Sequence, residues 1–117
     1  MSSTEKGRRG EAIAARYLET HNCRIIQKNF KCRAGEVDII GVRDDSVVFV
    51  EVKAWERMPF SELDRALDGR KRARIRAAAQ EFIRRYPIFG TFRPGFELLF
   101  ITDGGRSVQH TRITVGG

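Results

Sequence analysis

The sequence of 117 residues has little cysteine, a single tryptophan and no long apolar run. Its two cysteines, Cys23 and Cys32, form no CxxC pair and have no histidine at metal-ligating spacing, so we expect free thiols in a reducing compartment rather than a zinc site or a bridge. No segment reaches the roughly 18 apolar residues of a membrane span. Residues 1–6 lack the apolar core of a signal peptide. The expectation is a cytoplasmic protein without a membrane partner.

Acidic residues are in the minority. There are 22 Lys and Arg against 15 Asp and Glu, which gives a net charge of +7 and a pI near 10.1. Such an excess favours a polyanionic partner, with solubility alone as the plain alternative. Nucleic acid is favoured over anionic lipid, because no segment combines a basic face with a strong apolar stripe. The apolar fraction of 41% and this length suit one domain over residues 1–117.

Hydrophobic periodicity predicts an α/β fold with the element order α-β-β-β-α-β-β. Helices are expected over residues 4–20 and 62–85, the second with Ser61 as N-cap and Pro87 beyond its end. The expected strands cover residues 24–31, 36–42, 46–55, 96–102 and 107–115. The unbroken apolar run 47–50 indicates a strand covered on both faces, and the alternating polarity of the last strand indicates an edge.

A tight hairpin between the second and third strands sets the candidate site. A two-residue loop at Asp44-Asp45, or a four-residue loop over residues 43–46, pairs residues whose numbers sum to 89. Asp38 then lies opposite Glu51. Directly opposed residues have Cβ atoms roughly 4.5–5.5 Å apart, and like charges at that distance destabilise a sheet.

A divalent cation between Asp38 and Glu51 would remove this repulsion, and Mg²⁺ suits a site with few carboxylates. Lys53 follows Glu51 on the same face of the strand, where an ammonium can orient an attacking water or stabilise charge on a phosphate. The alternative is a structural ion-pair cluster that also includes Glu36, which the same register places opposite Lys53.

Two helical residues are further candidates. Lys71 falls in the apolar stripe of the second helix, so its ammonium either meets an acidic partner at the end of the sheet or reaches solvent. Glu11 on the first helix could complete a metal shell, although an exposed glutamate is ordinary. No role is assigned to His21 or His110.

The second helix also contains a dense basic block over residues 70–76, which is a credible edge for phosphate contacts. A solvated helix face is the alternative. Trp55, Met58 and Phe60 follow the candidate site and could stack on bases or contact a second copy, but packing under the loop is favoured. The candidate nucleic-acid contacts are Arg70, Arg72, Arg74, Lys31 and Arg33.

Three sequence blocks are found at a specific spacing: residues 7–18 (GRRGEAIAARYL), 29–40 (NFKCRAGEVDII) and 48–53 (VFVEVK). Together they resemble the YraN-type family of small bacterial proteins, a branch of the PD-(D/E)xK nuclease superfamily. The resemblance implies a restriction endonuclease-like core with a mixed sheet flanked by helices, similar to archaeal Holliday-junction resolvases. It also implies a homodimer.

The same resemblance implies roles for single residues. Asp38 and Glu51 look like the metal carboxylates, Lys53 like the catalytic lysine and the Val52 carbonyl like a further metal ligand. Glu11 looks like an accessory acid, and Lys71 like the polar residue of the second helix. The chain has Val37 where the superfamily has Pro and Trp55 where the family usually has Arg, which bears on substrate contacts more than on the metal.

The leading hypothesis is an endonuclease that uses Mg²⁺ or Mn²⁺ to hydrolyse phosphodiester bonds in DNA, with branched or damaged structures as candidate substrates. One rival is a nucleic-acid-binding module that has kept the fold and lost turnover. Another is an interaction protein whose charge serves protein partners. Fold analogy bears on the chemistry and says little about the pathway.

Overall fold

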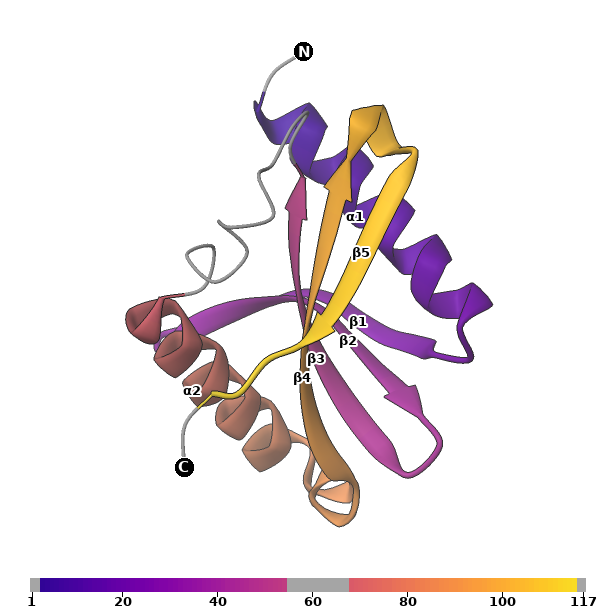
Figure 1. Cartoon of the computed structure of the whole chain (residues 1–117). Coiled ribbons are helices and arrows are strands. Elements are labelled where there is room, and N and C mark those ends of the chain that lie inside the picture. The colour runs from indigo at the N-terminus through magenta and orange to yellow at the C-terminus, as the bar shows by residue number, and fades with distance from the viewer. Residues whose placement is uncertain (1–2, 55–67, 116–117) are drawn as a thin grey trace.

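The computed structural model describes residues 3–54 and 68–115, without the side chains of residues 3–6 (Figure 1). The predicted element order α-β-β-β-α-β-β is confirmed. The helices and strands are α1 (Ser3–Thr20), β1 (Arg24–Cys32), β2 (Gly35–Arg43), β3 (Ser46–Ala54), α2 (Gly69–Arg85), β4 (Arg93–Thr102) and β5 (Ser107–Arg112). Two short 3-10 helices, η2 (Pro87–Thr91) and η3 (Asp103–Gly105), flank β4.

The five strands form one mixed sheet in the order β1-β2-β3-β4-β5. Neighbouring strands are antiparallel except β3 and β4, which are parallel. Helices α1 and α2 lie on opposite faces of this sheet (Figure 1). The mixed sheet flanked by helices is the architecture expected for a restriction endonuclease-like core, and β5 is the predicted edge strand.

Each face of the sheet has its own apolar core. Val47 and Phe49 pack with Phe82 on the α2 face, whereas Val48 and Val50 pack on the α1 face. All four residues of the run 47–50 are buried, as the unbroken apolar pattern predicted. The central strand is therefore covered on both sides over residues 47–50. The half-buried residues that follow include the polar Glu51 and Lys53. No helix among the described residues is long and apolar enough to cross a membrane.

The two cysteines are free thiols on opposite faces of the sheet. Cys23 is buried in the α1-face core, and Cys32 packs against the α2-face core. The expectation of free thiols is therefore confirmed.

The second helix begins later than the sequence analysis predicted. Asp68 is its N-cap: the backbone there is extended, and the side chain accepts a hydrogen bond of 2.9 Å from the Lys71 N–H. Because the backbone of Asp68 is extended, one continuous helix over residues 62–85 is excluded. The Asp68 side chain accepts a hydrogen bond from an N–H group that has no partner within the helix, and this fixes the first turn directly after Asp68. The expected cap, Ser61, lies outside the described residues.

The last two strands also differ from the predicted boundaries. Strand β4 begins at Arg93 rather than at residue 96, and β5 ends at Arg112 rather than at 115. Pro94 is tolerated in β4 because this part of the strand pairs with β3 alone, since β5 pairs only from Glu97 onward.

Candidate active site

The β2–β3 hairpin has the predicted register. Arg43 pairs with Ser46 across the two-residue turn, and Ile39 pairs with Val50, so the numbers of each pair sum to 89. The ladder ends at this second pair, one residue before Asp38 and Glu51 would face each other. The prediction that Asp38 and Glu51 are paired across the ladder is therefore wrong, and so is the prediction that Glu36 pairs with Lys53. The predicted register of the hairpin is correct.

The ladder ends because β2 changes course at Asp38. Val37 packs in the α2-face core and Ile39 in the α1-face core, although alternate residues of a regular strand share a face. The Asp38 carboxylate replaces a backbone acceptor: its Oδ2 accepts the Val52 N–H at 2.8 Å. This hydrogen bond anchors the acid against β3 at the point where β2 diverges.

A cavity of about 360 Å³ opens at this point of divergence. The residues that line it are Gly7, Glu11, Asp38, Glu51, Val52, Lys53 and Ala54. The structure thus brings together, from α1, β2 and β3, every residue predicted as a metal ligand, together with the predicted catalytic lysine.

The two central acids are not neutralised by their surroundings. Burial raises the pKa of Asp38 to about 7, with a further contribution from the negative charge of Glu51. Burial also raises the pKa of Glu51, although Lys53 opposes the shift through an ion pair of 3.4 Å between Nζ and Oε1. The Glu51 side chain is only 15% exposed. Burial thus disfavours the charged forms of both acids, and a cation bound beside them would stabilise those forms.

Lys71, on α2, interacts electrostatically with Lys53 and Glu51 of the cavity. The Lys53 ammonium lowers the pKa of Lys71, while the charge of Glu51 acts in the opposite direction. Lys71 is exposed and does not line the cavity, so the prediction that its ammonium meets an acidic partner stays a prediction. Two ammonium groups and two carboxylates converge on one end of the sheet.

Glu11 is held by a residue that the sequence analysis did not assign. Asn29 Nδ2 donates a hydrogen bond of 3.2 Å to Glu11 Oε2. Asn29 has a φ of 55°, which places a residue in the middle of β1 in the left-handed region. Asparagine adopts this region more readily than most residues. An asparagine between Lys28 and Phe30 in an otherwise ordinary strand was the available signal.

The donor set fits a magnesium-like ion of low protein coordination. No group of three or more His, Cys, Asp and Glu side chains that could hold a metal occurs within residues 3–54 and 68–115. Mg²⁺ needs only one or two carboxylates, since waters and phosphate oxygens supply its other ligands. The Val52 carbonyl projects to the same side of β3 as the N–H that contacts Asp38, where β2 has left the ladder. Asp38, Glu51 and this carbonyl are the residues that would hold the ion.

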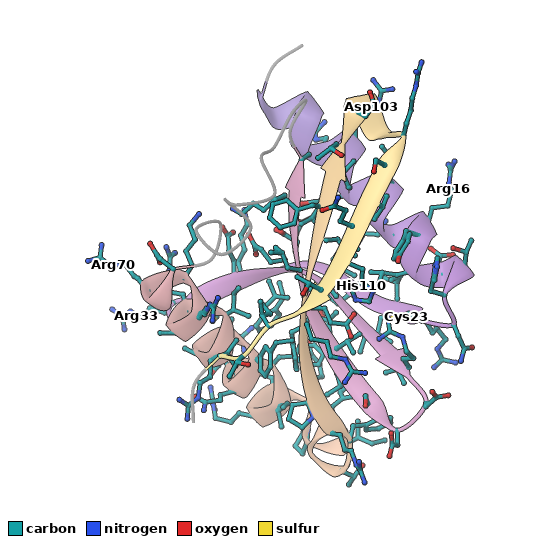
Figure 2. The ribbon with its side chains drawn as sticks, viewed as in Figure 1. Arg16, Cys23, Arg33, Arg70, Asp103 and His110 are labelled. Carbon is teal, nitrogen blue, oxygen red and sulfur yellow. The ribbon has the colours of Figure 1, made fainter. Side chains whose placement is uncertain are left out.

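The predicted nucleic-acid contacts separate into two groups. The β1–β2 turn packs against α2, since Gly35 lies directly against the Arg74 carbonyl. Arg33 and Arg70 are both exposed and point away from the body of the molecule (Figure 2). Arg72 lies on another side of α2, where its Nη1 donates to the Thr114 carbonyl at 3.2 Å. The five predicted residues therefore do not form one patch.

Another buried acid lies on the α1 face of the sheet. Glu97 is 4% exposed and contacts Arg43 at 2.7 Å and His110 Nε2 at 2.6 Å. Burial raises its pKa, but the hydrogen bonds from His110 and Arg43 outweigh burial and bring the pKa to about 2. No sequence pattern indicates this role for His110, because its partner is thirteen residues away and is set by the β4–β5 register.

Comparison with known proteins places these features in a family. The model of a family described as "Uncharacterised protein family UPF0102" matches residues 10–102, which include all the candidate active-site residues. A UPF0102 protein of Pelotomaculum thermopropionicum is 41% identical over 78 residues, covering 67% of this chain and 65% of the relative. Another, of Ectopseudomonas mendocina, is 33% identical over 104 residues, covering 89% and 87%. A third, of Pseudomonas fluorescens, is 37% identical over 108 residues, covering 92% and 87%.

Proposed function

This chain belongs to the uncharacterised protein family UPF0102, and we propose that it is an endonuclease that uses Mg²⁺ or Mn²⁺ to hydrolyse phosphodiester bonds in DNA. This is the YraN-type family that the three sequence blocks resemble. One observation supports the activity above all: Asp38 and Glu51 share a cavity with Lys53 and have raised pKa values. Strongly perturbed acids beside a cation in a cavity are typical of functional sites.

The cost of holding these acids close together is a reason to assign them a ligand. A bound divalent ion would neutralise the pair, polarise a phosphate oxygen and activate a water for in-line attack. Asp38 would bind it in a fixed orientation, because the Val52 N–H holds one carboxylate oxygen. Glu51 is similarly restrained by Lys53.

Lys53 is the group best placed to act on the reacting phosphate. Lys53 lines the cavity and its side chain is 22% exposed, so the ammonium that pairs with Glu51 is also open to an incoming ligand. A cation there would stabilise the charge that develops on the phosphate and orient the water. Lys71, beside it, would add positive charge from the second helix.

The DNA would approach over the basic junction of β1, β2 and α2. Lys31, Arg33, Arg70 and Arg74 are exposed at this junction, and Lys71 links it to the cavity. Contacts of this kind position the phosphate backbone without reading its sequence. The arrangement suits a substrate recognised by shape and charge.

The activity is tested by incubating the purified full chain with supercoiled plasmid, hairpin and four-way junction DNA in Mn²⁺, Mg²⁺ or EDTA. Asp38→Asn and Lys53→Ala remove the proposed metal ligand and the proposed cation, and Arg16→Gln on the remote part of α1 serves as the surface control. The wild type and Arg16→Gln are expected to cut in the presence of metal, whereas Asp38→Asn and Lys53→Ala are expected not to cut. Cutting that persists in Asp38→Asn would refute the assignment.

A second candidate function is a nucleic-acid-binding module without turnover. It is favoured by the contacts that Asp38 and Glu51 already make with the Val52 N–H and the Lys53 ammonium, which partly satisfy the acids without a metal. Salt-sensitive binding of DNA, with no cutting in any of the metal conditions, would support this second function. If the protein neither binds nor cuts DNA, the remaining hypothesis is an interaction protein whose charge serves protein partners.

A further inference from the structure

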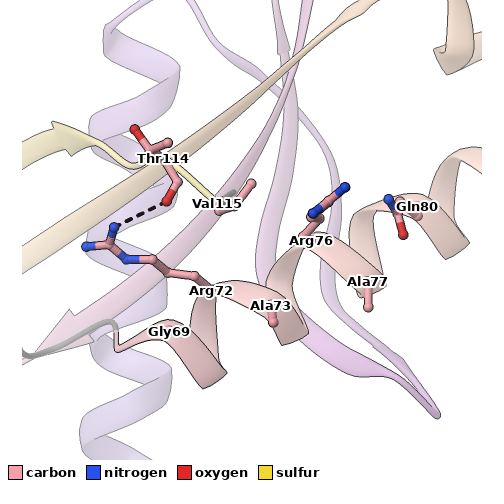
Figure 3. A pocket seen from close by; sticks show the side chains of 8 residues that line it. All are labelled: Gly69, Arg72, Ala73, Arg76, Ala77, Gln80, Thr114 and Val115. Carbon is pink, nitrogen blue, oxygen red and sulfur yellow. Dashed lines mark hydrogen bonds between the residues drawn. The ribbon is translucent and has the colours of Figure 1, made fainter. Parts of the chain in front are cut away.

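A groove runs along the outward side of α2, beside the chain segment that follows β5 (Figure 3). Its volume is about 570 Å³. Gly69, Ala73 and Ala77 contribute to it, each four residues from the next, and therefore lie on one side of the helix. Because these residues have small side chains or none, an extended ligand can approach the backbone of α2 closely.

Hydrogen-bond donors flank this low surface. Arg72, Arg76 and Gln80 border the groove from α2, and Thr114 borders it from the segment after β5. The hydrogen bond between Arg72 and the Thr114 carbonyl holds the segment beside the helix (Figure 3). Arg76 is exposed and has no hydrogen bond or ion pair within the described part of the chain.

The groove differs in charge from the other two cavities described in this molecule. The active-site cavity contains the carboxylates of Glu11, Asp38 and Glu51. The cavity beside Arg43 contains Asp44 and Asp45 among its arginines, together with Glu97. Among the described residues that line the groove there is no carboxylate; Arg76, Gln80 and Thr114 bring a guanidinium group, an amide and a hydroxyl, beside Arg72, whose Nη1 donates to the Thr114 carbonyl. This is a set of partners for the oxygens of an anion.

We propose that this groove binds the phosphodiester backbone of a nucleic-acid strand, as a second contact separate from the active site. The proposal rests on the proposed function and adds a second path for the substrate. From Gly69 to Gln80 the helix rises about 16 Å, at about 1.5 Å per residue, whereas a duplex strand has a charge about every 3.4 Å of the duplex axis. The groove is therefore long enough for more than one phosphate of a strand.

The same helix geometry separates this contact from the basic junction near the cavity. At about 100° per residue, Arg72 lies about 200° around the helix from Arg70. Arg70 and Arg74 face the β1–β2 turn, whereas Arg72 and Arg76 face the groove. Helix α2 thus offers two basic sides to one nucleic acid.

The test measures binding of labelled single-stranded and duplex oligonucleotides by fluorescence anisotropy, in EDTA and over a series of salt concentrations. Arg76→Gln is expected to weaken binding about fivefold and to reduce the slope of log K against log [salt] by about one. Arg16→Gln removes the same charge from an exposed position of α1, away from the groove (Figure 2), and is expected to leave the slope unchanged. Arg72 is left intact because it also holds Thr114.

Equal slopes for Arg76→Gln and Arg16→Gln would overturn the groove contact. Binding to phosphatidylserine vesicles that depends on Arg76, without binding to oligonucleotides, would overturn it in favour of a lipid surface. Neither result affects the proposed activity, because cutting in Mn²⁺ is scored separately and depends on Asp38. If Arg76→Gln changes the slope while the wild type never cuts, the groove contact stands and the endonuclease is refuted.

Discussion

Two buried carboxylates on neighbouring parts of one sheet experience opposite electrostatics. Glu97 meets Arg43 and His110, and its pKa falls to about 2 although burial acts against this. Asp38 is buried next to Glu51, and its pKa rises to about 7. Glu97 is paired with two basic side chains, whereas Asp38 accepts the Val52 N–H and lies against the carboxyl group of Glu51.

This difference separates a structural ion pair from a site that requires a ligand. A buried acid with complete partners fixes the strands around it and is costly to disrupt. A buried acid next to another acid lowers the stability of the folded state, and a bound cation would remove this cost. The comparison predicts that substitutions at the two sites will affect stability and activity in opposite ways.

The largest effect is expected for Asp38→Asn. The amide oxygen can still accept the Val52 N–H, but the charge that would bind a divalent ion is lost. Cleavage should fall about 10³-fold, equivalent to about 4 kcal/mol in the barrier. The melting temperature of the metal-free protein at neutral pH should stay the same or rise, since one of two repelling charges is gone.

The initial rate of plasmid cutting and a thermal melt measure the two halves of this prediction. Added Mn²⁺ should raise the melting temperature of the wild type and leave that of Asp38→Asn unchanged. A variant that melts lower than the wild type without metal would show that Asp38 is a structural acid like Glu97.

Glu97→Ala should have the reverse effect. It leaves Arg43 and His110 without their buried partner, and the free energy of unfolding in urea should fall by about 3 kcal/mol. Cutting by the fraction that remains folded should be unchanged. Asp45→Ala is the control, because its ion pair with Arg93 is exposed and should be worth less than about 0.5 kcal/mol. Equal losses for the two variants would contradict the assignment.

The two acids should also give opposite slopes of stability against pH. The pKa of Asp38 is raised from 3.8 to about 7, so the folded state holds a proton that the unfolded state has lost, and stability should fall as pH rises through this window. The pKa of Glu97 is lowered from 4.5 to about 2, so its stabilisation is complete above 4.5 and is lost as pH falls toward 2. Each slope is at most about 1.4 kcal/mol per pH unit.

Urea unfolding of the metal-free protein at a series of pH values tests both signs. Asp38→Asn should flatten the decline between about pH 4 and 7, and Glu97→Gln should flatten the rise between about pH 2 and 4.5. A decline near neutral pH that persists in Asp38→Asn would assign it to Glu51, whose pKa is also raised.

The sequence was sufficient to predict the features set by local rules. The two-residue turn at Asp44-Asp45 fixed the hairpin register, and the apolar run 47–50 identified the central strand. These in turn placed Asp38 and Glu51 at one cavity. Short-range geometry therefore accounted for most of the candidate site.

Features that depend on distant contacts were missed. The end of the ladder at Ile39 depends on the Asp38 side chain reaching across to Val52, which no pattern within β2 reveals. The partners of Glu97 come from β2 and β5, and their encounter depends on the register of strands far apart in the sequence. The contact of Arg72 with Thr114 joins α2 to the segment after β5, which is distant in the sequence.

The smallest expected effect tests whether Asn29 tunes the site through Glu11. Asn29→Gly removes the amide that holds Glu11, and glycine tolerates the positive φ of this position, so little strain is added. The apparent affinity for Mn²⁺ in the cleavage assay should fall about tenfold, as for outer-shell partners of metal ligands, with little change in the rate at saturating metal. Asn22→Gly is a matched control, because Asn22 also has a positive φ and contacts only Asp44 through its side chain within the described residues. Identical Mn²⁺ dependence in the two variants would mean that Glu11 lines the cavity without contributing to metal binding, and that Asp38 and Glu51 alone distinguish this region from the Glu97 cluster.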